Sequence, residues 1–411
     1  MTQTATTSTE PPGGGPVRQS RVFFARHWQR GAPGTPTPDW VVTLAYRMWL
    51  VALLCKLLGS SWDMSWHFRW LRDDLAPPHL LNSIGTVTVC VLVLIHTYTG
   101  MGCDKRSLRL MQAGTAVFLI AAPLDVINHR VSGLDLTAWS GTHLLLYLGT
   151  AIMIAGAIDG RLKHGKPGRA RTMTLGALWV FFLENAFFPN GQQEYGILSL
   201  RAWQNGSPDA EPELLGFAAE QLNRPVDAFA VQRFALPIDD WVYPLWGIGV
   251  MALILVAARV TARLRWTATV VAGVYVVYRA VIWPLLVAGG FPPSTVPFYL
   301  LFVGLAVDLA FRFGRTRVTT AVVAGAAVTT LGFGALYLQS QLAGWLELAG
   351  TQTAPPVNYW MAPVVFALVA VTVAAVTCVE LCGRCWLAVL RELHSGRVVR
   401  RLGRRCVICC G

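Results

Sequence analysis

The chain has 411 residues, of which 54% are hydrophobic and only 14% are charged, and its formal net charge is +12. Because a soluble domain carries about 25% charged residues, this composition excludes a soluble globular protein and indicates one embedded in a membrane. The excess of Lys and Arg follows the topology described below, so we expect no nucleic-acid partner.

Ten apolar runs predict transmembrane helices, since about 20 mostly apolar residues are needed to cross a bilayer. The runs cover residues of roughly 40–59, 79–99, 109–128, 142–158, 172–188, 240–258, 266–288, 296–311, 318–338 and 358–378. The expected fold class is therefore all-α, a polytopic integral membrane helical bundle of about 10 transmembrane helices.

Lys and Arg cluster before the first run and after every second run that follows. Basic residues that flank transmembrane helices stay on the cytoplasmic side, so the pattern predicts that both termini are cytoplasmic (N-in/C-in). We expect a multi-pass protein of the bacterial plasma (inner) membrane, surrounded by lipid.

This topology divides the chain into five parts. Residues 1–39 are rich in polar residues, Pro and Gly, which predicts a disordered cytoplasmic segment. Residues 40–188 hold the first five helices, 189–239 form the longest extracytoplasmic loop, and 240–380 hold the last five helices. Residues 381–411 form a cytoplasmic tail rich in Cys and Arg.

The first outer turn carries an acid and two histidines in WDMSWHFRWLRDDLAPPHLL, residues 62–81. Asp63 and His67 are four residues apart, so they share one face of a helix. His79 follows Pro77 and Pro78, and because proline is tolerated in the first turn of a helix, His79 is expected to open the returning helix. The turn therefore brings together one carboxylate and two imidazoles.

The second outer turn repeats this arrangement in LDVINHRVSGLDLTAWSGTHLLL, residues 124–146. Asp125 and His129 have the same spacing of four, and His143 opens the next helix after Gly141 and Thr142. Asp63, His67, His79, Asp125, His129 and His143 are thus the candidate metal ligands.

Two histidines and a carboxylate that leave open coordination positions form a recurrent catalytic metal site. The alternative is a hydrogen-bonded brace at the membrane interface, in which each histidine only caps or ties a helix. The occurrence of two matching hairpins favours the metal site, because ionisable groups near the membrane are usually functional.

Glu184 lies near the outer end of the fifth run, where a carboxylate is costly unless it is paired. We take it as the candidate for an additional ligand or catalytic proton carrier. The sequence does not indicate its partner.

The tail contains cysteines with the spacing of a four-thiolate zinc site. These are Cys382, Cys385, Cys406 and Cys409. Acylated or idle reduced cysteines are the alternatives, because the cluster lies beside a membrane and among arginines.

The spacing Asp63-x3-His67-x11-His79 resembles the Asp-x3-His-x12-His metal motif of the membrane-embedded C subunit of the particulate methane and ammonia monooxygenases, a copper-dependent family. Asp125, His129 and His143 match it more loosely. The pattern WD…WH…D…PPH within residues 62–79 is also similar to one in uncharacterised bacterial polytopic membrane proteins. The resemblance covers one short motif, and it implies ligand roles for these residues and copper as the metal.

Three functions remain open from the sequence. The first is a metal-dependent membrane enzyme, either a copper or iron oxygenase or a hydrolase, acting on a lipid or other small apolar substrate. The second is a transporter or metal-handling carrier, which requires polar groups deep in the helices. The third is a non-catalytic scaffold or sensor. The sequence leaves the oligomeric state open.

Overall fold

A computed structural model describes residues 28–71, 76–132, 137–262, 264–345 and 355–394 of the chain, without the side chains of 132, 343–345 and 379–394. Within these residues the protein is helical and has no β-strand, only a single bridge between Thr35 and Met101. The all-α fold class is confirmed. Most of the predicted terminal segments 1–39 and 381–411 lies outside the described residues.

The helices follow one another along the whole described chain. They are α2 (Asp39–His67), α3 (Pro77–Thr99), α4 (Lys105–Ser132), α5 (Gly141–Lys163), α6 (Arg169–Gln204), α7 (Pro212–Gln221), α8 (Ala228–Ala235), α9 (Val242–Pro244), α10 (Met251–Ala262), α11 (Thr267–Ala288), α12 (Tyr299–Phe313), α13 (Arg317–Trp345) and α14 (Ala362–His394). A π-helical turn, Leu245–Val250, joins α9 to α10, and a 3-10 turn, Tyr359–Met361, precedes α14.

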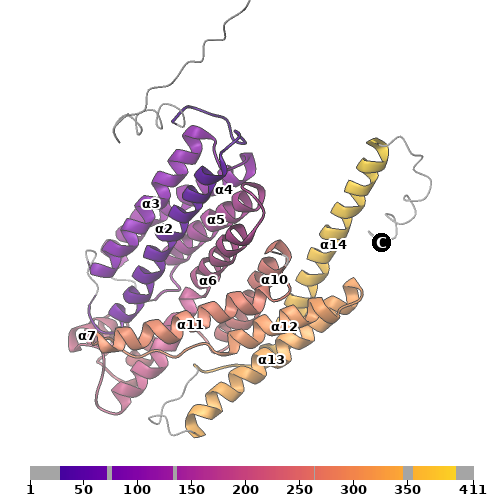
Figure 1. The fold of residues 1–411 in the computed structure, drawn as a ribbon. Helices are drawn as coiled ribbons and strands as arrows, with labels where there is room; N and C mark the ends of the chain where they lie inside the picture. Colours follow the sequence, from indigo (N-terminus) through magenta and orange to yellow (C-terminus); the bar gives the residue numbers. More distant parts are fainter. Residues whose placement is uncertain (1–27, 72–75, 133–136, 263, 346–354, 395–411) are drawn as a thin grey trace, which may run out of the picture.

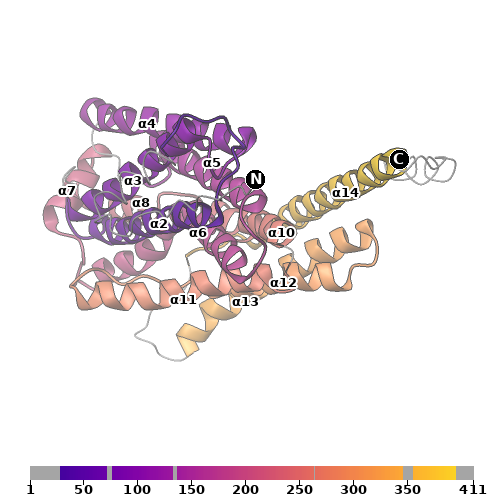
Figure 2. The same ribbon diagram turned by 45° about the horizontal axis from the view of Figure 1, so that its top comes forward.

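The long helices form two groups with α6 between them (Figures 1 and 2). In the first group α2 pairs with α3, and α4 pairs with α5. In the second group α10 to α14 pack in sequence, and α14 leans away from the first group. Helix α6 contacts α2 and α5 on one side and α10 and α11 on the other. It is therefore the element that joins the two groups.

Eight of the described helices are long and apolar enough to cross a membrane. The predicted run 172–188 lies in α6, and the run 296–311 is helical from Tyr299 onward, in α12, but these two helices are not among the eight. Helix α12 has 15 residues, which is fewer than the roughly 20 that a bilayer requires. The protein is membrane-embedded. The number of ten transmembrane helices and the cytoplasmic location of both termini stay predictions.

The segment 189–239, predicted as a loop, contains much helix. Helix α6 continues to Gln204, and α7 and α8 follow it. Its residues from Pro189 to Leu200 are almost all buried. Polar residues such as Asn190 and Gln192 end the apolar run at residue 188 without ending the helix, which is why the sequence suggested a loop.

Each of the first two helix pairs crosses at a glycine. A Cβ atom added at Gly85 of α3 would lie 2.6 Å from the carbonyl oxygen of Ala52 and 3.0 Å from the backbone nitrogen of Lys56. A Cβ added at Gly149 of α5 would lie 2.9 Å from the oxygen of Gly114 and 2.7 Å from the nitrogen of Phe118.

These crossings occupy the same places in the two hairpins. Gly85 and Gly149 each lie six residues after the histidine that opens the returning helix, His79 or His143. The contacted backbone groups lie at equal distances before Asp63 and Asp125. The two hairpins are therefore repeats of one structural unit, with the same register between their helices.

A buried ion pair connects α6 to the second group. The Arg279 guanidinium of α11 lies 2.9 Å from Oε2 of Glu194 and donates to the Ser294 hydroxyl at 2.8 Å. Tyr243 of α9 donates to the other oxygen of Glu194 at 3.3 Å. A charged pair this deep is stabilised by further hydrogen bonds to its partners, and Ser294 and Tyr243 supply two of them here.

We predict that Gly85→Ala destabilises the protein, because the added methyl group meets the backbone of α2 at less than the contact distance of real Cβ atoms. Overpacking of this kind costs about 1–3 kcal/mol. Thermal unfolding in detergent measures the effect. Gly176→Ala in α6 is the matched control, since a Cβ there has open space and alanine is the better helix former. Equal melting temperatures for the two variants would contradict the crossing described here.

Candidate metal centre

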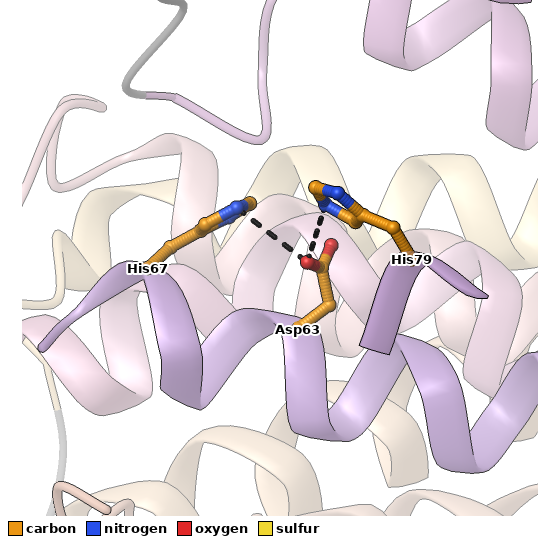
Figure 3. A group of neighbouring side chains, drawn as sticks. All are labelled: Asp63, His67 and His79. Atoms are coloured by element: carbon orange, nitrogen blue, oxygen red, sulfur yellow. Dashed lines mark ion pairs between the residues drawn. The ribbon is translucent and has the colours of Figure 1, made fainter. Parts of the chain in front are cut away.

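The last turn of α2 and the first turn of α3 bring the first three candidate ligands together (Figure 3). Asp63 and His67 lie one helical turn apart, with His67 Nε2 3.5 Å from Asp63 Oδ1. Pro77 and Pro78 occupy the first two positions of α3, where a missing N–H costs nothing. His79 follows them and places its Nε2 2.8 Å from the same oxygen. We call this group the first triad.

The end of α4 and the start of α5 form an equivalent group, the second triad. His129 Nε2 lies 3.5 Å from Asp125 Oδ1, and His143 Nε2 lies 3.6 Å from it. Helix α5 begins after Ser140, whose hydroxyl accepts a hydrogen bond from the backbone nitrogen of His143 at 3.2 Å. A serine cap thus does here what two prolines do in the first hairpin.

The two triads have closely similar geometry. The ring centroids of the two histidines are 5.7 Å apart in the first triad and 6.0 Å apart in the second, and the interplanar angle is 62° in both. In each triad the three donor atoms lie within 4.8 Å of one another. Both groups could therefore hold a metal ion by their residue types and spacing.

The donor distances fit a small transition-metal ion. With metal–ligand bonds of about 2.1 Å, two ligands lie about 3.0 Å apart at a right angle and about 3.4 Å apart at a tetrahedral angle. The carboxylate–imidazole distances of 2.8 to 3.6 Å span these values. Three protein ligands leave at least one coordination position open.

Hydrogen bonds behind the second triad fix two of its three ligands, Asp125 and His143. Nδ1 of His143 lies 2.8 Å from the carbonyl oxygen of Thr137. Because a carbonyl only accepts, Nδ1 carries the proton and Nε2 keeps its lone pair for a ligand. The hydroxyl of Thr142 donates to Asp125 Oδ1 at 2.6 Å. These contacts are the kind that orient metal ligands in proteins.

Helix α6 supports this arrangement from behind. Oε1 of Gln192 accepts hydrogen bonds from the backbone nitrogen of Ala138 at 2.7 Å and from the Thr137 hydroxyl at 3.2 Å. Gln192 thereby holds the stretch of chain whose carbonyl orients His143. The polar continuation of α6 is thus part of the site.

Both triads line the same cavity, which has a volume of about 480 Å³. Its walls come mainly from α2 to α6, and α7 and α8 each add one apolar residue. Phe118, Leu119, Val87 and Phe188 are among the apolar wall residues, and Lys56, Asn82 and Thr86 are among the polar ones. The sequence left open whether the two hairpins face each other, and the structure shows that they do. The first triad is the more exposed one: the His67 side chain is 26% exposed and that of His129 is 7% exposed.

Glu184, the predicted additional ligand or proton carrier, does not line this cavity. It is buried, as expected from its position in α6, and lies in a separate small cavity with Tyr275 and Arg279. Its neighbour Asn185 does line the main cavity and donates to the carbonyl oxygen of Tyr147 at 2.9 Å. The structure therefore does not place Glu184 with the six candidate ligands.

The proposed zinc ligands of the tail are not described. Cys406 and Cys409 lie outside the described residues, and Cys382 and Cys385 lie in the part of α14 whose side chains are not described. The zinc site stays a prediction.

Several residues around the triads were not found from the sequence. Lys56 and Asn82 lie on the helix faces of Asp63 and His79, at spacings of seven and three. Counting helical turns from Asp63 back along α2, and from His79 forward along α3, would have identified both residues. Gln192 gives no such signal, because its role depends on how α6 packs against the second outer turn.

No protein-family model matches the chain, and no curated protein or solved structure gives a significant match. The likeness to the C subunit of the copper monooxygenases therefore stays a prediction carried by the triads alone.

We predict that Thr142→Val weakens metal binding at the second triad by about 10- to 100-fold, as is typical when the partner of a ligand is lost. The isosteric change removes the hydroxyl that donates to Asp125. Titration of metal-depleted protein carrying His67→Ala measures the second triad alone. Thr115→Val is the control, because the Thr115 hydroxyl bonds only within its own helix, to the oxygen of Met111. An unchanged affinity in Thr142→Val would show that the hydroxyl does not support the site.

Proposed function

We propose that the protein is a membrane metalloenzyme in which each triad binds one metal ion, and that it oxidises a small apolar or amphiphilic molecule as a copper- or iron-dependent oxygenase. The observation that carries the proposal is the pair of matching Asp/His/His groups on the wall of one cavity. A brace needs neither the shared cavity nor the ligand-orienting hydrogen bonds of the second triad.

The donor set supports this choice of metals. Two imidazoles and one carboxylate with open positions are the ligands of non-haem iron oxygenases, and imidazole also suits copper. The metal would supply the oxidation chemistry. The residues of this chain would hold it through Asp63, His67 and His79, and through Asp125, His129 and His143.

The cavity suits a substrate that enters from lipid. Its apolar wall residues would exclude water from a bound molecule, and four of the helices that line it, α2 to α5, are long and apolar enough to cross a membrane. By this proposal the protein works in the bacterial inner membrane, with membrane lipids around it.

A metal-handling carrier is the second candidate. The observation in its favour is that Lys56 and Glu184 are buried ionisable groups within long helices, as carriers require. Metal uptake into proteoliposomes that contain the purified protein would favour the carrier over the enzyme.

We predict that the purified protein binds two copper or iron ions per chain. His67→Ala and His129→Ala should each lose one ion, and the double variant should lose both, because each change removes one of three ligands. Elemental analysis after reconstitution and desalting measures this. His164→Ala is the control, since His164 ends α5 at the other end of the helix from His143.

Two other outcomes are informative. Loss of both ions in either single variant would mean that the triads form one shared centre. No stoichiometric metal in the wild-type protein would leave the two triads as hydrogen-bonded braces and overturn the proposal.

We predict that the metal-loaded protein in nanodiscs consumes dioxygen when a reductant and an oxidisable amphiphile such as octanoate are present. Asp125→Asn should lower the rate of consumption, because it removes the carboxylate of the second triad. An oxygen electrode measures the rate, with protein-free nanodiscs as the blank. Metal binding without any oxygen consumption would exclude the oxygenase and leave a hydrolase, carrier or sensor.

A further inference from the structure

The two hairpins carry different side chains at two pairs of equivalent positions that line the cavity. Lys56 of α2 corresponds to Phe118 of α4, because each lies seven residues before its triad aspartate. Asn82 of α3 corresponds in the same way to Leu146 of α5. All four residues line the cavity. At these two positions below the triads, the first hairpin therefore presents polar side chains to the cavity and the second presents apolar ones.

The polar side centres on Lys56, whose side chain is buried. Its ammonium group donates hydrogen bonds to Asn82 Oδ1 and Thr86 Oγ1, both at 3.0 Å. It lies 4.4 Å from the ring centre of Phe118, its counterpart in the other hairpin. These partners orient the ammonium group, and each of them is neutral.

No carboxylate among the described residues makes an ion pair with Lys56. The acid that acts on it electrostatically is Glu184, which lies in the separate small cavity beside Arg279. A buried ammonium group without a paired anion is costly, and here it borders a space large enough for a ligand.

We propose that Lys56, Asn82 and Thr86 form an anion-binding subsite, so that the cavity takes an amphiphile whose carboxylate or phosphate group binds at Lys56. The apolar part of the molecule lies against Phe118 and Leu146, on the opposite hairpin. This inference deepens the proposed function by naming the substrate class, and it rests on that function only in treating the cavity as the reaction chamber.

The position of the subsite also sets where the molecule reacts. Lys56 lies seven residues from Asp63 along α2, which is about 10 Å at 1.5 Å per residue. A ligand anchored at Lys56 therefore presents to the triads a carbon several bonds away from its anionic group. Oxidation is expected at the apolar end of the molecule.

The test uses the full chain, freed of metal with a chelator and placed in nanodiscs of zwitterionic lipid. Isothermal titration calorimetry compares octanoate with octanol, which share a chain and differ in charge, and empty nanodiscs give the blank. We expect octanoate to bind at least about tenfold more tightly, as a charge-assisted hydrogen bond gives. Lys56→Met should remove this preference.

Two variants serve as comparisons. Lys105→Met removes the same charge from an exposed position at the start of α4 and should keep the preference. Lys56→Gln removes the charge but can still hydrogen-bond to Asn82 and Thr86, and it replaces Lys56→Met if that variant does not fold. Equal binding of octanoate and octanol to the wild-type protein, or a preference that survives both Lys56 variants, would overturn the subsite.

Octyl phosphate distinguishes the two sources of the anion. Tighter binding of octanoate would indicate a free fatty acid, and tighter binding of octyl phosphate would indicate a lipid phosphate. Because the protein is metal-free, the result is independent of the metal analysis. If octanoate is preferred here but the separate metal analysis finds no bound metal, the subsite is kept and the oxygenase is rejected. If the metal analysis finds bound metal but octanoate is not preferred, only the subsite is rejected.

Discussion

The close crossing of two helices at a glycine is the constraint on which each triad depends. At Gly85 the backbone of α3 lies directly against that of α2, and Gly149 does the same for α5 and α4. A slip of one residue along either helix would move a histidine by about 1.5 Å, which is a large part of a ligand distance. The fixed register between the two helices therefore places residues that are separated in sequence, such as Asp63 and His79, in contact.

Helix α6 relates the two hairpins to the remainder of the bundle. Its polar continuation is held by buried contacts on both sides, through Gln192 to the second outer turn and through Glu194 to Arg279. Polar groups this deep specify one arrangement, because any other leaves them without partners. Hydrogen bonding therefore adds to apolar packing in holding the hairpins around the cavity.

The helical fold and both triads could be predicted from the sequence because they depend on local spacing. Asp63 and His67 repeat at one helical turn, and proline marks the start of α3. The shared cavity could not be predicted, since no local pattern records how two hairpins face each other.

The helix after residue 188 was missed because its polar residues, which are buried against other elements, have the composition of a loop. Glu184 was recognised as a buried acid, but the spacing of neighbouring residues did not indicate which cavity it would line.

The unequal exposure of the two triads has a consequence for electron transfer. Identical ligand sets give identical net charges, but the second triad is the more buried. A low-dielectric environment disfavours the state of higher charge. If both triads held a one-electron metal, as we propose, that metal would be easier to reduce in the second triad, and electrons that entered at the exposed first triad would collect at the buried one.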